Sequence, residues 1–549
     1  MTIRLGYQEE TDFYRLLAGL GMNYLEVDAV DEMWSCHIVG LPGHGKSVLL
    51  QNLAEQFVAA GDGVLLMDLK GDLARSAVTH TRFFDRVIYI DPAEAKRHHH
   101  YWSLNPLEFD RDDTLNYEYY ANNLFDLFVR IGAVDPAIMV EIKKVMSEAI
   151  ALALSRKGTT LVDVFLALHD EAHRRYLLDA PHLPPMNRQF WVKMFLAMSP
   201  RDRASKVDKT DTRIRDIMRG DYMSRMLAHP TSSLKLMEWL DQGKYVIFNL
   251  NQSVLSASTA RRMANLVLGY LAGEINRRPE GQVAPMIRII VDEATELATK
   301  PFAEMINQMR TYNAFPIFAH QNLGQLNNSP ELRDAAEGAA VKIALQVTEA
   351  DAAVIGRRRG SEAGEEAETL GKYRAVVTRT QGPPDAPRRQ KIMLLPVAEE
   401  DHPDQLRQAL DRQLELALHE NKMQTLFDFD HFNRGTTEGH HERRKPPDNQ
   451  RKDRQAKENH PTPPPPRPHA GQDLPERDDS GVVRGVASPE QPPLAGQQAA
   501  PRPPVSPPPV VPPPGPSEKI GRGHRKGLQP PQPYTPQRPR ADHPKGDPS

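Results

Sequence analysis

The chain has 549 residues, enough for more than one domain, and its formal net charge of −3 indicates no particular kind of partner. No run of 18 consecutive apolar residues occurs, so we expect no membrane-spanning helix. The first residues lack the basic and apolar regions of a signal peptide, and the single cysteine, Cys36, excludes an intramolecular disulfide. These features predict a cytoplasmic protein.

The first 32 residues are too few for a domain of their own. Apolar side chains at 13–20 have helical spacing, which predicts a helix or an edge element packed on the core. An apolar run at 34–39 then predicts the first strand of a sheet.

The sequence after this strand is GLPGHGKS, which has the spacing G-x-x-x-x-G-K-[ST] of a phosphate-binding loop, or P-loop. A helical pattern follows at 48–53, and the N-terminus of such a helix favours an anion. Lys46 is expected to reach the β- and γ-phosphates, and Ser47 to ligate Mg²⁺. The candidate nucleotide-binding residues are Gly40, Leu41, Pro42, Gly43, His44, Gly45, Lys46 and Ser47.

Two more apolar runs, at 63–72 and 86–91, predict strands of a parallel sheet, with Asp68 at a carboxyl end beside the P-loop. Helical periodicity over 112–235 predicts an all-α insertion between two halves of the sheet domain. Its charged section, 201–219, is typical of a solvated helix face; contact with nucleic acid is the alternative.

The sheet is expected to resume at 244–250, and a helix at 256–277 to follow. The run at 286–293 then ends in two carboxylates, as the second nucleotide motif of P-loop ATPases does. In this interpretation Asp292 holds the Mg²⁺ shell, and Glu293 orients or deprotonates the attacking water.

A helix at 302–311 and a strand at 314–320 lead to Gln321, which can either sense the γ-phosphate or cap a turn. Further strands are predicted at 340–347, 372–378 and 390–396, and a short helix at 349–355. The arginines 357–359 are expected in a loop, where solvation is favoured over phosphate contact.

An amphipathic helix with an aromatic tip is predicted at 403–432. Past residue 440 lie 29 of the 48 prolines, with almost no aromatic residues, so this part cannot bury enough apolar surface to fold. We predict a disordered tail that is either a spacer or a carrier of proline-rich docking motifs.

Taken in order, these motifs resemble the FtsK–HerA superfamily, and most closely the TraD/TraG-type coupling ATPases of conjugative type IV secretion. The segments that carry the resemblance are the P-loop, DLKGD, GKYVIFNLN, IIVDEA and MRTYNAFPIFAHQNLGQL. The resemblance implies that Gln321 senses the nucleotide and that Arg310 is a finger reaching into the site of a neighbouring subunit. The corresponding fold is a RecA-like α/β domain with an inserted all-α domain.

The expected organisation has five parts: 1–111, the first half of the nucleotide-binding domain; 112–235, the all-α insertion; 236–400, the second half; 401–435, a helical segment; and 436–549, the tail.

The resemblance further implies a homo-hexamer that uses ATP and Mg²⁺ to pump DNA without sequence specificity during conjugation. Relatives of this type usually begin with transmembrane helices, so this chain is expected either to reach the inner membrane through membrane-channel or relaxosome proteins or to act away from the membrane. The alternatives are a cytosolic DNA translocase or helicase in repair or segregation, a genome-packaging motor, and a nucleotide-gated adaptor that hydrolyses little ATP.

Overall fold

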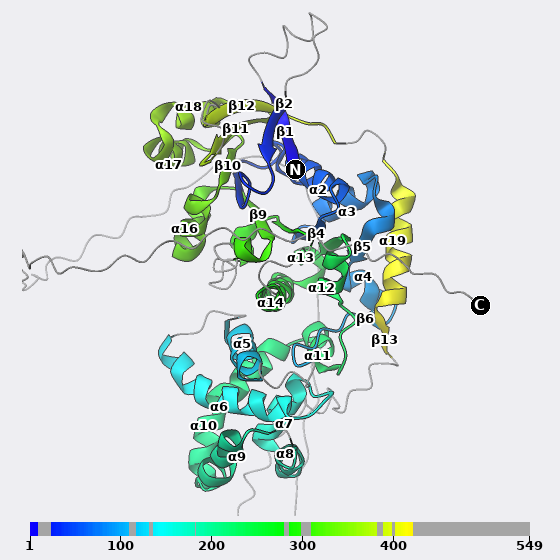
Figure 1. Ribbon diagram of the computed structural model, residues 1–549, viewed down its shortest axis with the longest axis vertical. Coiled ribbons are helices and arrows are strands. Elements are labelled where there is room, and N and C mark those ends of the chain that lie inside the picture. The colour runs from blue at the N-terminus through cyan, green and yellow to red at the C-terminus, as the bar shows by residue number, and fades with distance from the viewer. Residues whose placement is uncertain are drawn as a thin grey trace, which may run out of the picture. The chain divides into compact units, whose positions relative to one another are not determined.

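A computed structural model describes most of the first 420 residues (Figure 1). The chain divides into two units, 1–448 and 449–549, and every described residue belongs to the first. The predictions for 13–20, for most of the helix at 302–311, for the aromatic tip and for the tail concern residues outside the described part of the chain. The described ranges are 1–8, 24–108, 117–130, 136–181, 183–278, 285–297, 309–381, 388–397 and 401–420.

Eleven of the described strands form one large sheet, in the order β2-β1-β12-β11-β10-β3-β9-β8-β4-β7-β5, and two short strands, β6 (His100–Tyr101) and β13 (Leu418–His419), pair separately. From β10 to β5 every neighbouring pair is parallel, whereas the pairs from β2 to β10 are antiparallel. The bounds are β1 Thr2–Gln8, β2 Tyr24–Asp28, β3 Cys36–Val39, β4 Gly63–Asp68, β5 Val87–Ile90, β7 Tyr245–Asn249, β8 Ile287–Val291, β9 Ala314–His320, β10 Val341–Ala344, β11 Arg374–Arg379 and β12 Arg389–Leu394.

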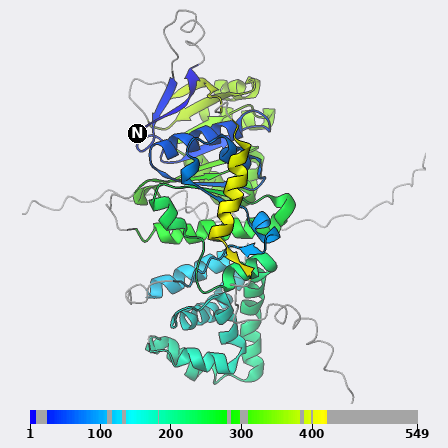
Figure 2. The ribbon, with the colours of Figure 1, turned by 90° about the vertical axis from the view of Figure 1, so that its right-hand side faces the viewer.

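The parallel strands are buried on both faces, which explains why their sequences are continuous apolar runs. Along β4, Val64 and Leu66 join one core cluster and Leu65 and Met67 join the other. One cluster includes α2 (Lys46–Ala59), α3 (Asp72–His80) and α19 (Pro403–Leu416); the other includes α12 (Leu236–Asp241) and α14 (Ala257–Ile275). Figure 2 shows α19, in yellow, running along the helices of the first of these clusters.

Between β6 (His100–Tyr101) and β7, the described chain is helical, and Figures 1 and 2 show most of these helices grouped together beside the sheet. Their apolar side chains share a core cluster with one face of the sheet. Besides α12, the helices are α5 Tyr117–Arg130, α6 Pro136–Leu154, α7 Leu161–His169, α8 Glu171–Leu178, α9 Pro185–Gln189, the π-helical η3 Phe190–Phe195, α10 Pro200–Met218 and α11 Asp221–Ala228.

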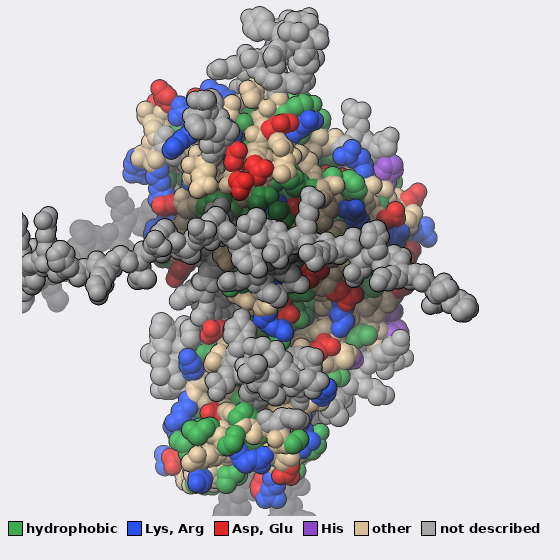
Figure 3. Space-filling view, in the orientation of Figure 1, with side chains coloured by type: hydrophobic (Ala, Val, Ile, Leu, Met, Phe, Trp, Pro, Cys, Tyr) green, Lys and Arg blue, Asp and Glu red, His purple; other side chains and the backbone are tan. Residues whose placement is uncertain are grey.

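The charged section of the sequence forms α10, which buries one apolar stripe that includes Val207 and Ile214. Elsewhere its charges pair along the helix, for example Arg215 with Asp211. On the face seen in Figure 3, basic and acidic side chains are interspersed over the helical part. This arrangement fits the solvated face favoured by the sequence, because alternating charges offset one another.

Most of the remaining described elements are helices that connect strands of the large sheet, and β13 pairs with β6. The N-terminal residues form β1 and β2, and β2 is an edge strand of the large sheet. These elements are η1 Phe84–Arg86, α4 Pro92–Arg97, α13 Gln252–Leu255, η4 Ala294–Leu297, η5 Met309–Tyr312, η6 Leu323–Asn328, α16 Pro330–Gly338, α17 Glu349–Arg359, α18 Ser361–Thr369 and β13 Leu418–His419.

The loop expected at 357–359 is wrong, because these arginines are the last turn of α17. The helix continues through Gly356 and ends at Gly360, whose φ is 98°. The predicted fold class, an α/β sheet domain with inserted helices, is confirmed. Within the described part of the chain, no helix has the length and apolar character needed to cross a membrane.

Candidate active site

The P-loop connects β3 to α2, at the carboxyl edge of the parallel strands. Gly43 and Gly45 have φ angles of 77° and 107°, which residues with a side chain rarely adopt. A Cβ added at Gly45 would lie 2.8 Å from a methyl carbon of Leu394. No side chain caps α2 at Gly45, and its first turn contains no acidic residue. The loop therefore directs uncapped backbone N–H groups and a positive dipole end towards the edge of the sheet.

Lys46 and Ser47 begin α2. The Lys46 side chain is buried, and its Nζ donates to the Gly40 carbonyl oxygen at 2.7 Å. Burial lowers the pKa of the Lys46 ammonium, while the carboxylates of Asp292 and Glu293 act in the opposite direction. Ser47 is exposed. The loop thus places the Lys46 ammonium close enough to interact with Asp292 and Glu293, and leaves the Ser47 hydroxyl accessible.

The acidic pair follows β8, two strands from β3. Asp292 is 5% exposed, and burial, followed by the charges of Asp68 and Glu293, raises its pKa to about 6. Lys70 and Lys46 oppose this rise. The Oδ1 atom of Asp292 accepts a hydrogen bond from the backbone N–H of Glu293 at 3.0 Å. At neutral pH the carboxyl is mostly ionised, but its charge is costly without a further cation.

Glu293 is the point where three segments meet. Its Oε1 accepts a hydrogen bond from Gln321 Nε2 at 2.9 Å. The same atom forms an ion pair with Lys70 Nζ at 2.5 Å. Its φ of 55° lies in the left-handed region, which is a strained backbone conformation for a non-glycine residue. The structure therefore brings Gln321 to Glu293.

Lys70 was not singled out from the sequence, although it lies in the DLKGD segment. The strand order explains why: β4 lies next to β8, so the turn after β4 reaches the end of β8. The same order corrects the expectation for Asp68, since β8 and β9 separate β4 from the P-loop strand. The Asp68 carboxylate instead accepts hydrogen bonds from the backbone N–H groups of Lys70 and Ala74, at 2.8 and 2.9 Å, and fixes the start of α3.

A buried histidine pair links β3 to β9 behind this site. His37 Nε2 and His320 Nε2 are 2.6 Å apart, and His320 Nδ1 is 2.9 Å from the carbonyl oxygen of Asn322. Burial lowers the pKa of His320 to about 4, so this imidazole is neutral at physiological pH. Isolated histidines give no sequence signal for such a contact, because it depends on which strands are neighbours.

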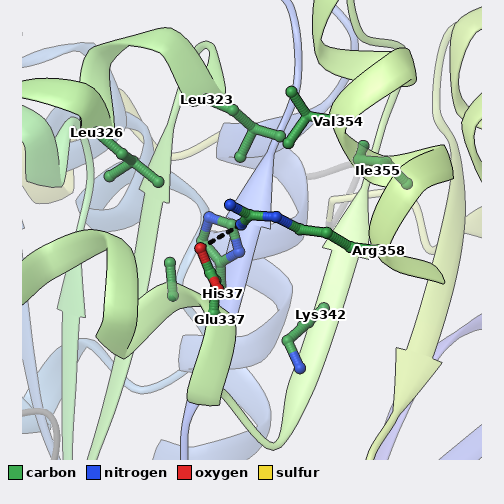
Figure 4. Close-up of a pocket in the computed structure, with 9 residues that line it drawn as sticks. His37, Leu323, Leu326, Glu337, Lys342, Val354, Ile355 and Arg358 are labelled. Atoms are coloured by element: carbon green, nitrogen blue, oxygen red, sulfur yellow. Dashed lines mark ion pairs between the residues drawn. The ribbon is translucent and has the colours of Figure 1, made fainter. Parts of the chain in front are cut away.

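His37 also lines a cavity of about 290 Å³ (Figure 4). Because its neighbours Cys36 and Ile38 join the core cluster of α2, His37 faces the other side of the sheet. Arg358 of α17 extends across the cavity and forms an ion pair with Glu337. The remaining lining residues are Leu323, Leu326, Ala336, Lys342, Val354 and Ile355.

The side chain of Arg310 lies outside the described part of the structure. Its backbone belongs to the 3₁₀-helix η5, which precedes β9. The finger role of Arg310 stays a prediction.

Residues 31–95 match the family model described as Helicase HerA-like C-terminal. Among curated proteins, none matches this chain. Three solved structures of the coupling protein TrwB align with it, each at 16% identity. The complex with ADP and Mg²⁺ has a TM-score of 0.51 over 73% of this chain and 96% of TrwB. The complex with the non-hydrolysable ATP analogue ADPNP has a TM-score of 0.50 over 68% of this chain and 88% of TrwB. The unbound form, described as a bacterial conjugative coupling protein, has a TM-score of 0.50 over 68% of this chain and 87% of TrwB.

The first nucleotide motif thus lies in the segment that matches the HerA-like family model, and the fold of the chain is similar to that of TrwB. The predicted resemblance to P-loop ATPases of the FtsK–HerA type is confirmed.

Proposed function

We propose that this protein is an ATPase that drives DNA through a homo-hexameric ring, as a coupling motor in conjugative transfer. One observation supports the proposal most strongly: Glu293 is buried, bonded to Gln321, and close enough to Lys46 to influence the pKa of that lysine. These residues come from three strands of one carboxyl edge, which is where parallel α/β sheets bind ligands. The TrwB fold and its description as a conjugative coupling protein supply the context.

The residues fit ATP and Mg²⁺. The uncapped start of α2 suits phosphates, and TrwB has been solved with ADP and Mg²⁺. Ser47 and Asp292 would hold the metal, because Mg²⁺ prefers hydroxyl and carboxylate oxygens, and Asp292 is a buried carboxyl whose negative charge Lys70 and Lys46 offset only in part. When bound, Mg²⁺ would offset negative charge on the phosphate oxygens.

In this mechanism Lys46 leaves the Gly40 carbonyl and binds the phosphates. Glu293 accepts a proton from the attacking water, while Gln321 holds the carboxylate and senses the nucleotide. Arg310 would enter the site of the neighbouring subunit and offset charge on the transferred phosphoryl group. DNA would be gripped through its backbone, so binding should weaken steeply with salt.

The test is ATP hydrolysis by the purified protein, with single- or double-stranded DNA or without DNA, combined with mass measurements with and without nucleotide. We expect DNA to stimulate turnover and nucleotide to favour a hexamer. Lys46→Ala should reduce turnover at least about a hundredfold, whereas Lys235→Met, at a surface ion pair 3.7 Å from Glu108, should not. Turnover that is retained in Lys46→Ala would show that the site is assigned wrongly.

The HerA-like match over residues 31–95 favours a second candidate, a cytosolic DNA translocase or helicase. A relaxase or a membrane-channel gene beside the coding sequence would support transfer, and placement at the inner membrane through such a partner. A nuclease gene would support repair, and capsid genes would support genome packaging. ATP binding without turnover, with or without DNA, would instead indicate a nucleotide-gated adaptor.

A further inference from the structure

The turn that follows β4 holds Lys70 in a defined place. Because the Asp68 carboxylate accepts hydrogen bonds from the backbone N–H groups of Lys70 and Ala74, the main chain of the turn is fixed. The side chain of Lys70, by contrast, is 51% exposed. A long side chain that is half in solvent can change partner without movement of the backbone that carries it.

The present partner of Lys70 is the group on which the proposed reaction depends. Lys70 Nζ lies 2.5 Å from Glu293 Oε1, an atom that also accepts the hydrogen bond of Gln321 at 2.9 Å. The Glu293 side chain is only 5% exposed, so solvent screens this contact little from the carboxylate side. Charge-assisted hydrogen bonds of this kind stabilise the anion.

A carboxylate oxygen has two lone pairs, so the Oε1 atom that already accepts from Gln321 and Lys70 has no lone pair left for an attacking water. While the ion pair is intact, the two donors also hold the carboxylate in one orientation. Lys70 therefore opposes the very step that Glu293 would perform.

We propose that Lys70 is a positioning residue that restrains Glu293, and that stimulation of turnover by DNA includes its release. This inference rests on the proposed function, because it needs Glu293 to act as the base. A motor with such a restraint would hydrolyse little ATP without its DNA track. The half-exposed lysine is suited to the role, since water or a phosphate group can replace the carboxylate as its partner.

The test measures kcat and KM for ATP, with and without double-stranded DNA, for the full-length protein and for Lys70→Met, Lys70→Gln and Lys70→Arg. We expect both neutral variants to raise the DNA-free kcat about tenfold, which corresponds to about 1.4 kcal/mol, with KM unchanged. The kcat with DNA should change little, so the stimulation ratio should fall. Lys70→Arg keeps the cation and should retain the low DNA-free rate, and Lys235→Met is the control for loss of a surface ion pair.

A DNA-free kcat that stays the same or falls in both neutral variants would overturn the restraint, as would a Lys70→Arg variant that behaves like Lys70→Met. A fall would assign Lys70 to the reaction itself. Glu293→Gln separates this failure from that of the proposed function. If Glu293→Gln abolishes turnover and the neutral variants do not raise it, only the restraint is wrong. If Glu293→Gln retains turnover, the proposed function fails first.

Discussion

Replacement of Asp292 by asparagine should stabilise the folded protein at neutral pH while it abolishes turnover. The carboxyl is 5% exposed and has the carboxylates of Asp68 and Glu293 as neighbours, which together with burial raise its pKa to about 6. An asparagine is isosteric and uncharged, and its side-chain oxygen can still accept the hydrogen bond that Asp292 receives from the Glu293 N–H.

The size of the stability change, and the pH range over which it occurs, follow from the pKa of Asp292. Because the pKa of Asp292 in the folded protein lies above the ordinary value of 3.8, the folded state binds this proton more tightly than the unfolded state does. Stability is therefore lost as pH rises from about 4 to about 6, and the cost at pH 7.5 is about 3 kcal/mol. The asparagine variant avoids this cost, but Lys46 and Lys70 lose an attractive neighbour, so we expect a net gain of about 1–3 kcal/mol.

The assay is urea unfolding of wild type and Asp292→Asn at pH 7.5 and pH 4.5, without nucleotide or divalent cations. The variant should gain stability at pH 7.5 and lose most of that gain at pH 4.5. Asp334→Asn, at a side chain that is 73% exposed, is the control and should change stability by less than about 0.5 kcal/mol. An equal gain at both pH values, or a loss at pH 7.5, would refute the argument from desolvation and charge.

Other substitutions test separate parts of the account. Gly45→Ala should weaken nucleotide binding and lower the free energy of unfolding by about 1–2 kcal/mol, because φ is 107° there; calorimetric titration with ATP measures the first effect. Arg288→Met should destabilise by about 3–5 kcal/mol in urea unfolding, because it leaves the buried Asp62 without the guanidinium 2.9 Å away. Arg310→Ala should lose turnover alone but regain part of it when mixed with Lys46→Ala subunits; a mixture that stays inactive would contradict a shared site.

Several elements could be predicted closely because their sequence patterns are local. β9 has the bounds expected from its apolar run. The P-loop could be found because glycines at fixed positions serve a backbone conformation that other residues adopt with difficulty.

The contacts between distant segments could not be predicted, because a strand's sequence does not name its neighbours. The pairing of β4 with β8 brings Lys70 to Glu293, 223 residues later, and the pairing of β3 with β9 brings His37 to His320. Helix α17 extends beyond its predicted end at 355, because the glycine that follows, Gly356, does not interrupt it and the arginines 357–359 are helical.

The central claim is that Glu293 serves as the base of an ATP site whose turnover responds to DNA. The most direct measurement is steady-state ATP hydrolysis by the full-length protein and by Glu293→Gln, each with and without double-stranded DNA. We predict that DNA stimulates the wild type and that Glu293→Gln binds ATP but turns over at least about a hundredfold more slowly in both conditions. A Glu293→Gln variant that hydrolyses ATP at the wild-type rate would contradict the account.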